Sequence, residues 1–339
     1  GQLSDRVCSV IRPSINKRFK NQTPIGVPSM TQVKSTWLAY VAMAMMAMAP
    51  LVVQAEDEMK PFILASVSSG NIADKIDGVK SELGGKGIEV VGEYSPYPTA
   101  HIIVVTNDAL KKAAASHERA GYVAAQRVTI TRVGDEVQIA YTNPVYMGAA
   151  YRVKADLSDV ADSLRDALGA EKEYGPEEGL TAKELEKYHY TFGMEYFDET
   201  NRLASYNSYK EAVAAVEKGL AAHKGDTSKV YRIDIPGSKQ TVFGVSMAAK
   251  GETGNKFMDE SFIMTQIDFK PLRSTGHLPY EILVMGSEVE ALHGRFRIAM
   301  NFPDLSMMGA NSFMNIMPTP DAIKDSLTLV AGGDLIDDF

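Results

Sequence analysis

The chain is almost without cysteine: among its 339 residues only Cys8 is present. A single cysteine cannot form an internal disulfide, and beyond residue 8 there is no thiolate nucleophile, no iron–sulfur ligand set and no c-type haem attachment motif. Histidine is also sparse, and no two of the six histidines are three or four positions apart. The sequence therefore contains no helical His-x-x-x-His zinc pair.

Positive charge is in deficit, with 35 lysines and arginines against 43 aspartates and glutamates, a formal net charge of −8. Nucleic-acid binding is disfavoured because it needs clustered positive charge. The apolar share of 45% and the charged share of 23% match an ordinary globular protein rather than a disordered or polytopic membrane chain. The expected partner is a small molecule or a protein. Membrane contact is expected only through an uncleaved N-terminal segment, and the oligomeric state is left open, a dimer included.

The N-terminal region has the pattern of an export signal. The first methionine is Met30, so residues 1–29 are interpreted as a non-native or upstream leader. Residues 30–55 contain Lys34, an apolar run from Trp37 to Val53 and a small-residue site ending at Ala55, which together predict a signal peptide of the general export pathway. No cysteine follows, which argues against a lipoprotein. We expect a soluble periplasmic protein, with an uncleaved membrane anchor as the alternative.

The remaining chain contains an internal repeat. Apolar residues at helical spacing occur twice, each set following a residue that can cap a helix, Asn71 in the first half and Ser208 in the second. Two strand-like pairs, 88–94 with 101–105 and 230–235 with 241–245, read as hairpins. The two apolar sets are Ile72, Ile76, Val79 and Leu83, and Tyr209, Val213, Val216 and Leu220.

A second hairpin is expected in each half, at 127–141 and at 281–300, and each half ends in a further helix. The closing strands align Ile139–Pro144 with Ile298–Pro303, which predicts that Ile139 and Ile298 lie on equivalent strands, the latter within 296–301. The fold class expected from this order is α+β, with two tandem two-layer sandwiches, each a mostly antiparallel sheet with helices on one face.

The repeat divides the chain at its charged and glycine-rich stretches. We expect a first α+β module at 56–172, a second at 201–333 and an acidic tail at 334–339. The connector at 173–200 should hold a short helix capped by a Thr181–Glu184 capping box. Its aromatic residues are expected to dock onto one or both modules.

The stretches Arg127–Pro144 and His277–Val284, together with Ile298–Pro303, resemble the central hairpin of the domain of unknown function 302 family. That family is similar in element order, and a proline ends its hairpin as Pro144 and Pro303 do here. The first module departs from this pattern, with Val123 where the second has Pro279. The resemblance implies a fold and, because the family has no settled activity, it implies no catalytic residues.

Five polar residues near the aligned closing strands are candidates for ligand binding. Two related sheets packed with pseudo-twofold symmetry would create a concave seam, to which these side chains could contribute. The alternative is that each serves only a turn, since asparagine favours turns. The candidates are Asn143, Tyr146, Tyr151, Asn301 and Asn311.

Methionines cluster near the C-terminus, close in sequence to His293. Thioether sulfurs suit Cu(I), so this is the one metal that the sequence suggests, and no other cofactor is expected. The competing interpretation is that methionine fills the core. The members of the cluster are Met300, Met307, Met308, Met314 and Met317.

Three functions remain in competition. The first is non-catalytic binding of a small molecule or partner at the seam between the modules, since the sequence has no catalytic motif such as Gly-x-Ser-x-Gly. The second is a hydrolase-like enzyme whose site is assembled only in the fold. The third is a structural or assembly role. The missing motif favours a non-catalytic role, and the sequence leaves open whether the protein is an enzyme.

Overall fold

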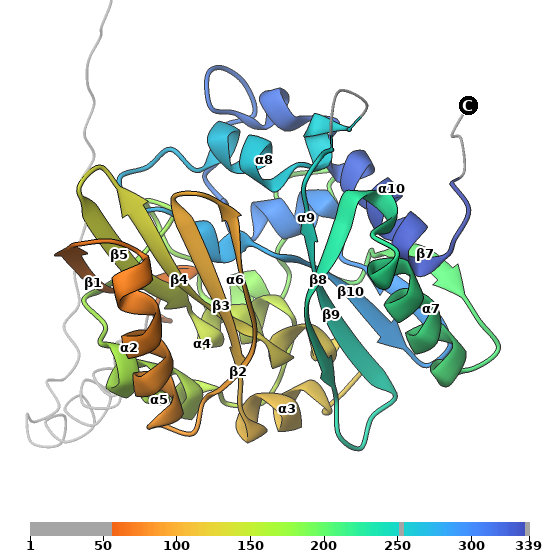
Figure 1. Ribbon diagram of the computed structural model, residues 1–339, viewed down its shortest axis with the longest axis horizontal. Helices are drawn as coiled ribbons and strands as arrows, with labels where there is room; N and C mark the ends of the chain where they lie inside the picture. Colours follow the sequence, from red (N-terminus) through yellow and green to blue (C-terminus); the bar gives the residue numbers. More distant parts are fainter. Residues whose placement is uncertain (1–55, 251–253, 336–339) are drawn as a thin grey trace, which may run out of the picture. The chain divides into compact units, whose positions relative to one another are not determined.

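Two antiparallel sheets, of six and five strands, organise the computed structural model, which describes residues 56–250 and 254–335 (Figure 1). Nine α-helices lie between and after the strands of these described ranges. The expected α+β class is thus confirmed. The predictions for residues 1–55, including the signal peptide, lie outside the described residues.

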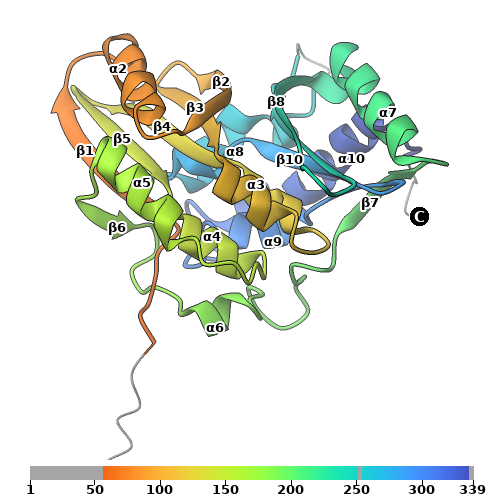
Figure 2. The same cartoon turned by 90° about the horizontal axis from the view of Figure 1, so that it is seen from below.

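The first sheet has the strand order β2-β3-β4-β5-β1-β6. Helices α2 (Ala73–Gly84) and α5 (Ser158–Leu168) lie side by side over one of its faces (Figure 2). Val79, Leu83, Val160 and Leu164 are their buried residues. The strands are β1 (Phe62–Ser69), β2 (Glu89–Tyr97), β3 (Ala100–Thr106), β4 (Gln126–Val133), β5 (Glu136–Thr142) and β6 (Lys172–Tyr174), and the other helices are α3 (Asp108–Ala114), η1 (Ala120–Ala124) and α4 (Pro144–Ala150).

The second sheet has the strand order β7-β11-β10-β9-β8. Helices α7 (Tyr209–Ala221) and α10 (Thr319–Ala331) pack against it and against each other (Figure 1). The strands are β7 (Asn201–Ser205), β8 (Thr227–Asp234), β9 (Gln240–Met247), β10 (Tyr280–Met285) and β11 (Glu288–Ala291). The remaining helices are η2 (Lys224–Asp226), η3 (Lys256–Met258), α8 (Glu260–Ile267), η4 (Thr275–His277), α9 (Gly294–Ala299) and η5 (Phe313–Ile316).

The two halves share one strand order. Reading β2-β3-β4-β5-β1 in the first sheet against β8-β9-β10-β11-β7 in the second pairs every strand of one half with the strand at the same place in the other. In both halves a helix follows the first strand: α2 follows β1, and α7 follows β7. The shared strand order is what an internal duplication predicts. The module boundaries stay predictions, since the chain from Glu56 onward forms one unit.

The predicted equivalence of Ile139 and Ile298 is wrong. Ile139 lies in β5, but Ile298 lies in helix α9, so there is no strand at 296–301. The strand equivalent to β5 is β11, whose glutamates hid it from the hydrophobic pattern. Short apolar runs such as 296–300 fit a strand or a buried helix equally well, and periodicity alone cannot separate them.

The residue equivalent to Asn143 is consequently His293. Each side chain caps the helix that follows its hairpin: Asn143 Oδ1 accepts from the amide of Val145, and His293 Nδ1 accepts from the amide of Arg295. An N-cap acceptor satisfies one of the free amides of the first helical turn. Both polar residues therefore have a structural role at the start of a helix.

Two of the expected helix caps are confirmed. Ser208 accepts from the amide of Glu211, and Thr181 with Glu184 forms the capping box of α6 (Ala182–Leu185). The Asn71 cap is wrong, because the N-cap of α2 is Ile72, one residue later, and it makes no side-chain hydrogen bond to the helix.

The connector docks as expected. The Tyr188 and Tyr190 hydroxyls donate to the carbonyl oxygens of Ala299 and Leu305, and Phe197 is buried. Among the described residues, no helix has the length and apolarity that crossing a bilayer requires.

The two halves meet through their edge strands and through exchanged loops. Edge strands β2 and β8 each carry a β-bulge and pack together, so closely that a Cβ on Gly92 would overlap the carbonyl of Val230. Gln240 in β9 accepts from the amide of Gly121 in η1, and η4 of the second half packs on β3, β4 and β5. This seam brings polar residues from both halves together.

Candidate functional site

A cluster of charged side chains is buried at the seam. Arg127 in β4 and Arg297 in α9 both contact the carboxylate of Glu281 in β10, and the three side chains are at most 3% exposed. Both guanidiniums also donate to the carbonyl oxygen of Pro279. Charges are buried only when paired and hydrogen-bonded, so this cluster ties the two halves to one relative arrangement.

His277 and Asn301 extend the cluster. Arg297 donates to Asn301 Oδ1, and His277 Nδ1 lies 2.8 Å from the same oxygen. Burial and the neighbouring Arg297 hold the pKa of His277 well below its usual value, so the ring is neutral. A neutral ring that donates through Nδ1 accepts at Nε2 from the Tyr280 hydroxyl, 2.8 Å away.

A cleft of about 580 Å³ opens at the surface of the seam, here called the outer cleft. Its walls come from both halves: Tyr97, Pro98, Thr99 and 131–134 from the first, and Ser261, Met264, Thr265, Asp268, Phe269 and Arg273 from the second. A hydrogen bond of 2.8 Å between Thr131 and Thr275 joins the halves beside it. Small-molecule sites occupy roughly 300 to 1,000 Å³, so the size fits a ligand.

Asp268 is the carboxyl group of the outer cleft, and its acidity is strongly perturbed. Desolvation raises its pKa to about 7, although Ser274 donates its amide to Oδ1 at 2.9 Å and Arg273 is nearby. Burial also raises the pKa of Tyr97, so its hydroxyl stays protonated at neutral pH. At neutral pH, Asp268 can therefore give up or accept a proton within the cleft.

A second, smaller pocket, here called the inner pocket, adjoins the outer cleft at Asp268. It has a volume of about 20 Å³, and Ser274, Asn301 and Phe302 are among its walls. Lys270 also lines it and pairs with Asp304 at 2.5 Å. Asp268 and Phe269 line both the inner pocket and the outer cleft, so the two spaces adjoin each other at these residues.

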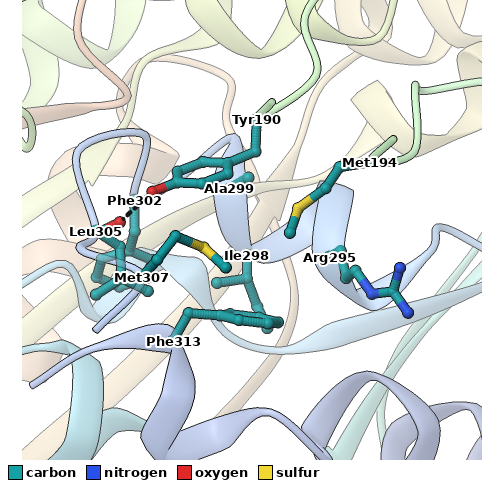
Figure 3. Close-up of a pocket in the computed structure, with 9 residues that line it drawn as sticks. All are labelled: Tyr190, Met194, Arg295, Ile298, Ala299, Phe302, Leu305, Met307 and Phe313. Atoms are coloured by element: carbon teal, nitrogen blue, oxygen red, sulfur yellow. Dashed lines mark hydrogen bonds between the residues drawn. The ribbon is translucent and has the colours of Figure 1, made fainter. Parts of the chain in front are cut away.

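The methionine cluster is mostly at the surface. Met307, Met308, Met314 and Met317 are exposed by 39% to 69%, so core packing is the wrong interpretation for these four, while Met300 is buried. Met307 and Met194 approach one apolar pocket of about 10 Å³ from opposite sides (Figure 3). His293 is not among its lining residues; it caps α9 beside Glu195.

Metal binding by the cluster therefore stays a prediction. No group of three or more histidine, cysteine, aspartate or glutamate side chains with metal-site geometry occurs in the described part of the chain. Thioether sulfurs are a separate kind of ligand, and Arg295 lines the apolar pocket that Met307 and Met194 approach. A guanidinium beside the methionines would oppose a bound cation.

Of the five candidate ligand residues, only Asn301 lines one of the pockets of the seam. Asn143 caps α4 and donates to the carbonyl of Lys60, and Tyr146 donates to the carbonyl of Met300. Tyr151 is buried against Phe197, and Asn311 donates to the carbonyl of Gln266 at the end of α8. The structure does not gather the five into one site.

Sequence reasoning missed Arg127, Glu281, Arg297, His277 and Asp268. Three of them stand inside apolar runs, where a charge is unexpected: Arg127 and Glu281 in strands and Arg297 in 296–300. Buried charged residues are rare unless paired, so a charge within such a run was the available signal. His277 and Asp268 carried no comparable signal.

Glu260 gives the free energy of unfolding a testable dependence on pH. The side chain is buried, accepts from the Tyr94 hydroxyl at 2.9 Å, and has its pKa raised to about 8 by desolvation. The folded state therefore holds a proton that the unfolded chain releases above its pKa of about 4.3. We expect the free energy of unfolding to fall by more than about 1 kcal/mol between pH 5 and pH 8.

Urea unfolding at several pH values measures this slope. Glu260→Gln should be less dependent on pH and more stable than the wild type at pH 8, because it cannot ionise. Equal slopes for the two proteins would contradict the assignment. Glu288→Gln, at an exposed position, is the control.

The seam is thus a buried ionic cluster with two adjoining pockets, one of them large enough for a ligand. No protein-family model, curated protein or solved structure matches the chain.

Proposed function

We propose that the chain is an exported binding protein that holds a small polar molecule in the outer cleft. The observation that carries the proposal is that both halves build the walls of this cleft, which has a ligand-sized volume of about 580 Å³. A second cleft of about 510 Å³ is lined by residues of the second half alone. Export rests on the signal-like segment 30–55.

The side chains of the outer cleft favour a polar ligand. Hydroxyl groups of Thr131, Ser261 and Thr265 line it together with Arg132 and Asp268. Arg132 is exposed, and no carboxylate pairs with it among the described residues. An unpaired guanidinium and several hydroxyls can position a ligand by directional hydrogen bonds.

We also propose, from the resemblance of the hairpin residues Arg127–Pro144 and His277–Val284 alone, that each half is related to the domain of unknown function 302 family. We propose this relation for the fold alone. It adds nothing about the ligand, because that family has no settled activity.

The binding proposal is tested by mass spectrometry of small molecules retained by the purified full chain. We expect a retained ligand in the wild type and at least a tenfold loss in Arg132→Gln, which removes one of the two arginines that line the cleft. Arg165→Gln changes an exposed arginine on α5 and is the matched control. An empty wild type, or equal retention in the two variants, would overturn the proposal.

A hydrolase-like enzyme is the second candidate, favoured by one observation. A carboxyl group with a pKa of about 7 in a cleft, as for Asp268, suits general acid–base catalysis at neutral pH. Turnover of the retained ligand that disappears in Asp268→Asn, with binding kept, would favour the enzyme over the binding protein.

A further inference from the structure

The inner pocket contains an unsatisfied hydrogen-bond donor. Asn301 is 1% exposed, and its Nδ2 has no partner among the described residues. The orientation of the amide follows from its neighbour: Arg297 has only donors, so the group facing it must be the oxygen of Asn301. The nitrogen is then on the other side of the amide, and Asn301 lines the inner pocket.

An unpaired buried donor costs free energy unless something accepts its hydrogen bond. The volume of about 20 Å³ exceeds the roughly 10 to 15 Å³ that one water molecule needs. Arg297 polarises the amide by bonding to its oxygen, which strengthens the donor on the opposite side. The pocket is therefore suited to an acceptor oxygen.

The charges around Asn301 favour an acceptor with negative charge. Arg127 and Arg297 share the single carboxylate of Glu281, and His277 is neutral. Glu260 does not supply the missing negative charge at neutral pH, because burial raises its pKa to about 8. One positive charge in the cluster is left without a partner, and an anion nearby gains from it.

We propose that the inner pocket binds the carboxylate of a small organic acid, with Asn301 Nδ2 as the donor to one carboxylate oxygen. The inference rests on the proposed binding function and names the chemical class of its ligand. The rest of the acid extends past Asp268 into the outer cleft, since Asp268 lines both spaces.

Asp268 makes the binding depend on pH. When a ligand carboxylate lies beside the carboxyl group of Asp268, two negative charges would repel each other. The pair therefore keeps one proton. The groups that face Asp268 are Tyr97, Tyr174, Arg273 and, across the pocket, the Lys270–Asp304 pair. Since the pKa of Asp268 is about 7, binding should take up a proton and weaken as pH rises from 6 to 8.

The test is a titration of the full chain with acetate, followed by the ¹H–¹⁵N signals of the asparagine side chains. The Asn301 signal is identified by its disappearance in Asn301→Asp. We expect it to shift saturably with acetate, with affinity at least threefold higher at pH 6 than at pH 8. Acetamide, which has the same size and no charge, should bind at least tenfold more weakly than acetate.

Asn301→Asp keeps an oxygen where Arg297 and His277 contact the side chain, and it replaces the donor with a second carboxylate oxygen, so the side chain itself supplies the negative charge. We expect at least a tenfold loss of acetate affinity, measured on the remaining shifting signals, with unfolding still cooperative. Asn311→Asp makes the same change outside both pockets and should bind acetate as the wild type does. Asp268→Asn should remove the dependence on pH, because it cannot titrate.

An Asn301 signal that does not respond to acetate, as when the pocket holds only an ordered water, would overturn the inference. So would equal acetate binding by wild type and Asn301→Asp. A native ligand whose retention depends on Arg132 but not on Asn301 would overturn the inference and leave the binding function standing. Acetate binding by a protein that retains no native ligand would overturn the proposed binding function and leave the carboxylate site standing.

Discussion

Glu281→Ala is expected to lower the free energy of unfolding by about 3 to 5 kcal/mol, the cost typical of removing one partner of a buried ion pair. Within residues 56–250 and 254–335, Glu281 is the one carboxylate that contacts both Arg127 and Arg297, so the substitution leaves two buried guanidiniums without that anion. Their desolvation is then uncompensated. Equilibrium unfolding in urea measures the loss.

The control for Glu281→Ala is Glu288→Ala. Glu288 also pairs with an arginine, Arg202, but both side chains are at least 38% exposed. Exposed ion pairs contribute about 0 to 1 kcal/mol, so this variant should stay close to the wild type. Similar losses in the two variants would show that the seam cluster is not sealed from water.

Gly219→Ala is expected to destabilise the fold by about 1 to 3 kcal/mol, although alanine favours helices more than glycine does. Gly219 lies inside α7 where this helix meets α10, and a Cβ there would overlap the backbone carbonyl of Val330. The helices must move apart to accept the methyl group. The change is measured by thermal and urea unfolding.

Gly78→Ala is the matched substitution in the equivalent helix of the first half. A Cβ on Gly78 in α2 meets no atom within 4 Å. The variant should gain about 0.5 to 1 kcal/mol from helix propensity. If Gly219→Ala were equally stabilising, the close approach of α7 and α10 would not exist.

The hairpins and flanking helices were predictable because their signals are local. Short apolar runs at 101–105 and 241–245 correspond to β3 and β9. Helical spacing from Ile72 to Leu83 and from Tyr209 to Leu220 corresponds to α2 and α7. Local signals failed at 296–301, where an apolar run is a helix, and at β11, where Glu288 and Glu290 interrupt the pattern of a strand. Pairing with β7 and β10 stabilises that strand against its own composition.

The candidate site was less predictable than the fold. Asn301 was selected for its place in an alignment that the structure contradicts, yet it lines the inner pocket. Its partner His277 is 24 positions away, and the Arg127–Glu281 pair joins the two halves. Contacts between residues so far apart in the sequence leave no periodic pattern in it, so the sequence could not predict them.

The sequence by itself determined the α+β class, the repeated order of strands and helices, and the acidic, nearly cysteine-free composition. These properties depend on side-chain patterns within about ten residues and on residue counts. Only the tertiary structure decided that Arg127, Glu281 and Arg297 form one cluster, that Asp268 lines two adjoining pockets, and that the Asn301 Nδ2 donor lacks a partner among the described residues. Burial and pairing at the seam arise when the two sheets pack, and desolvation then sets the charges of Asp268, Glu260 and His277.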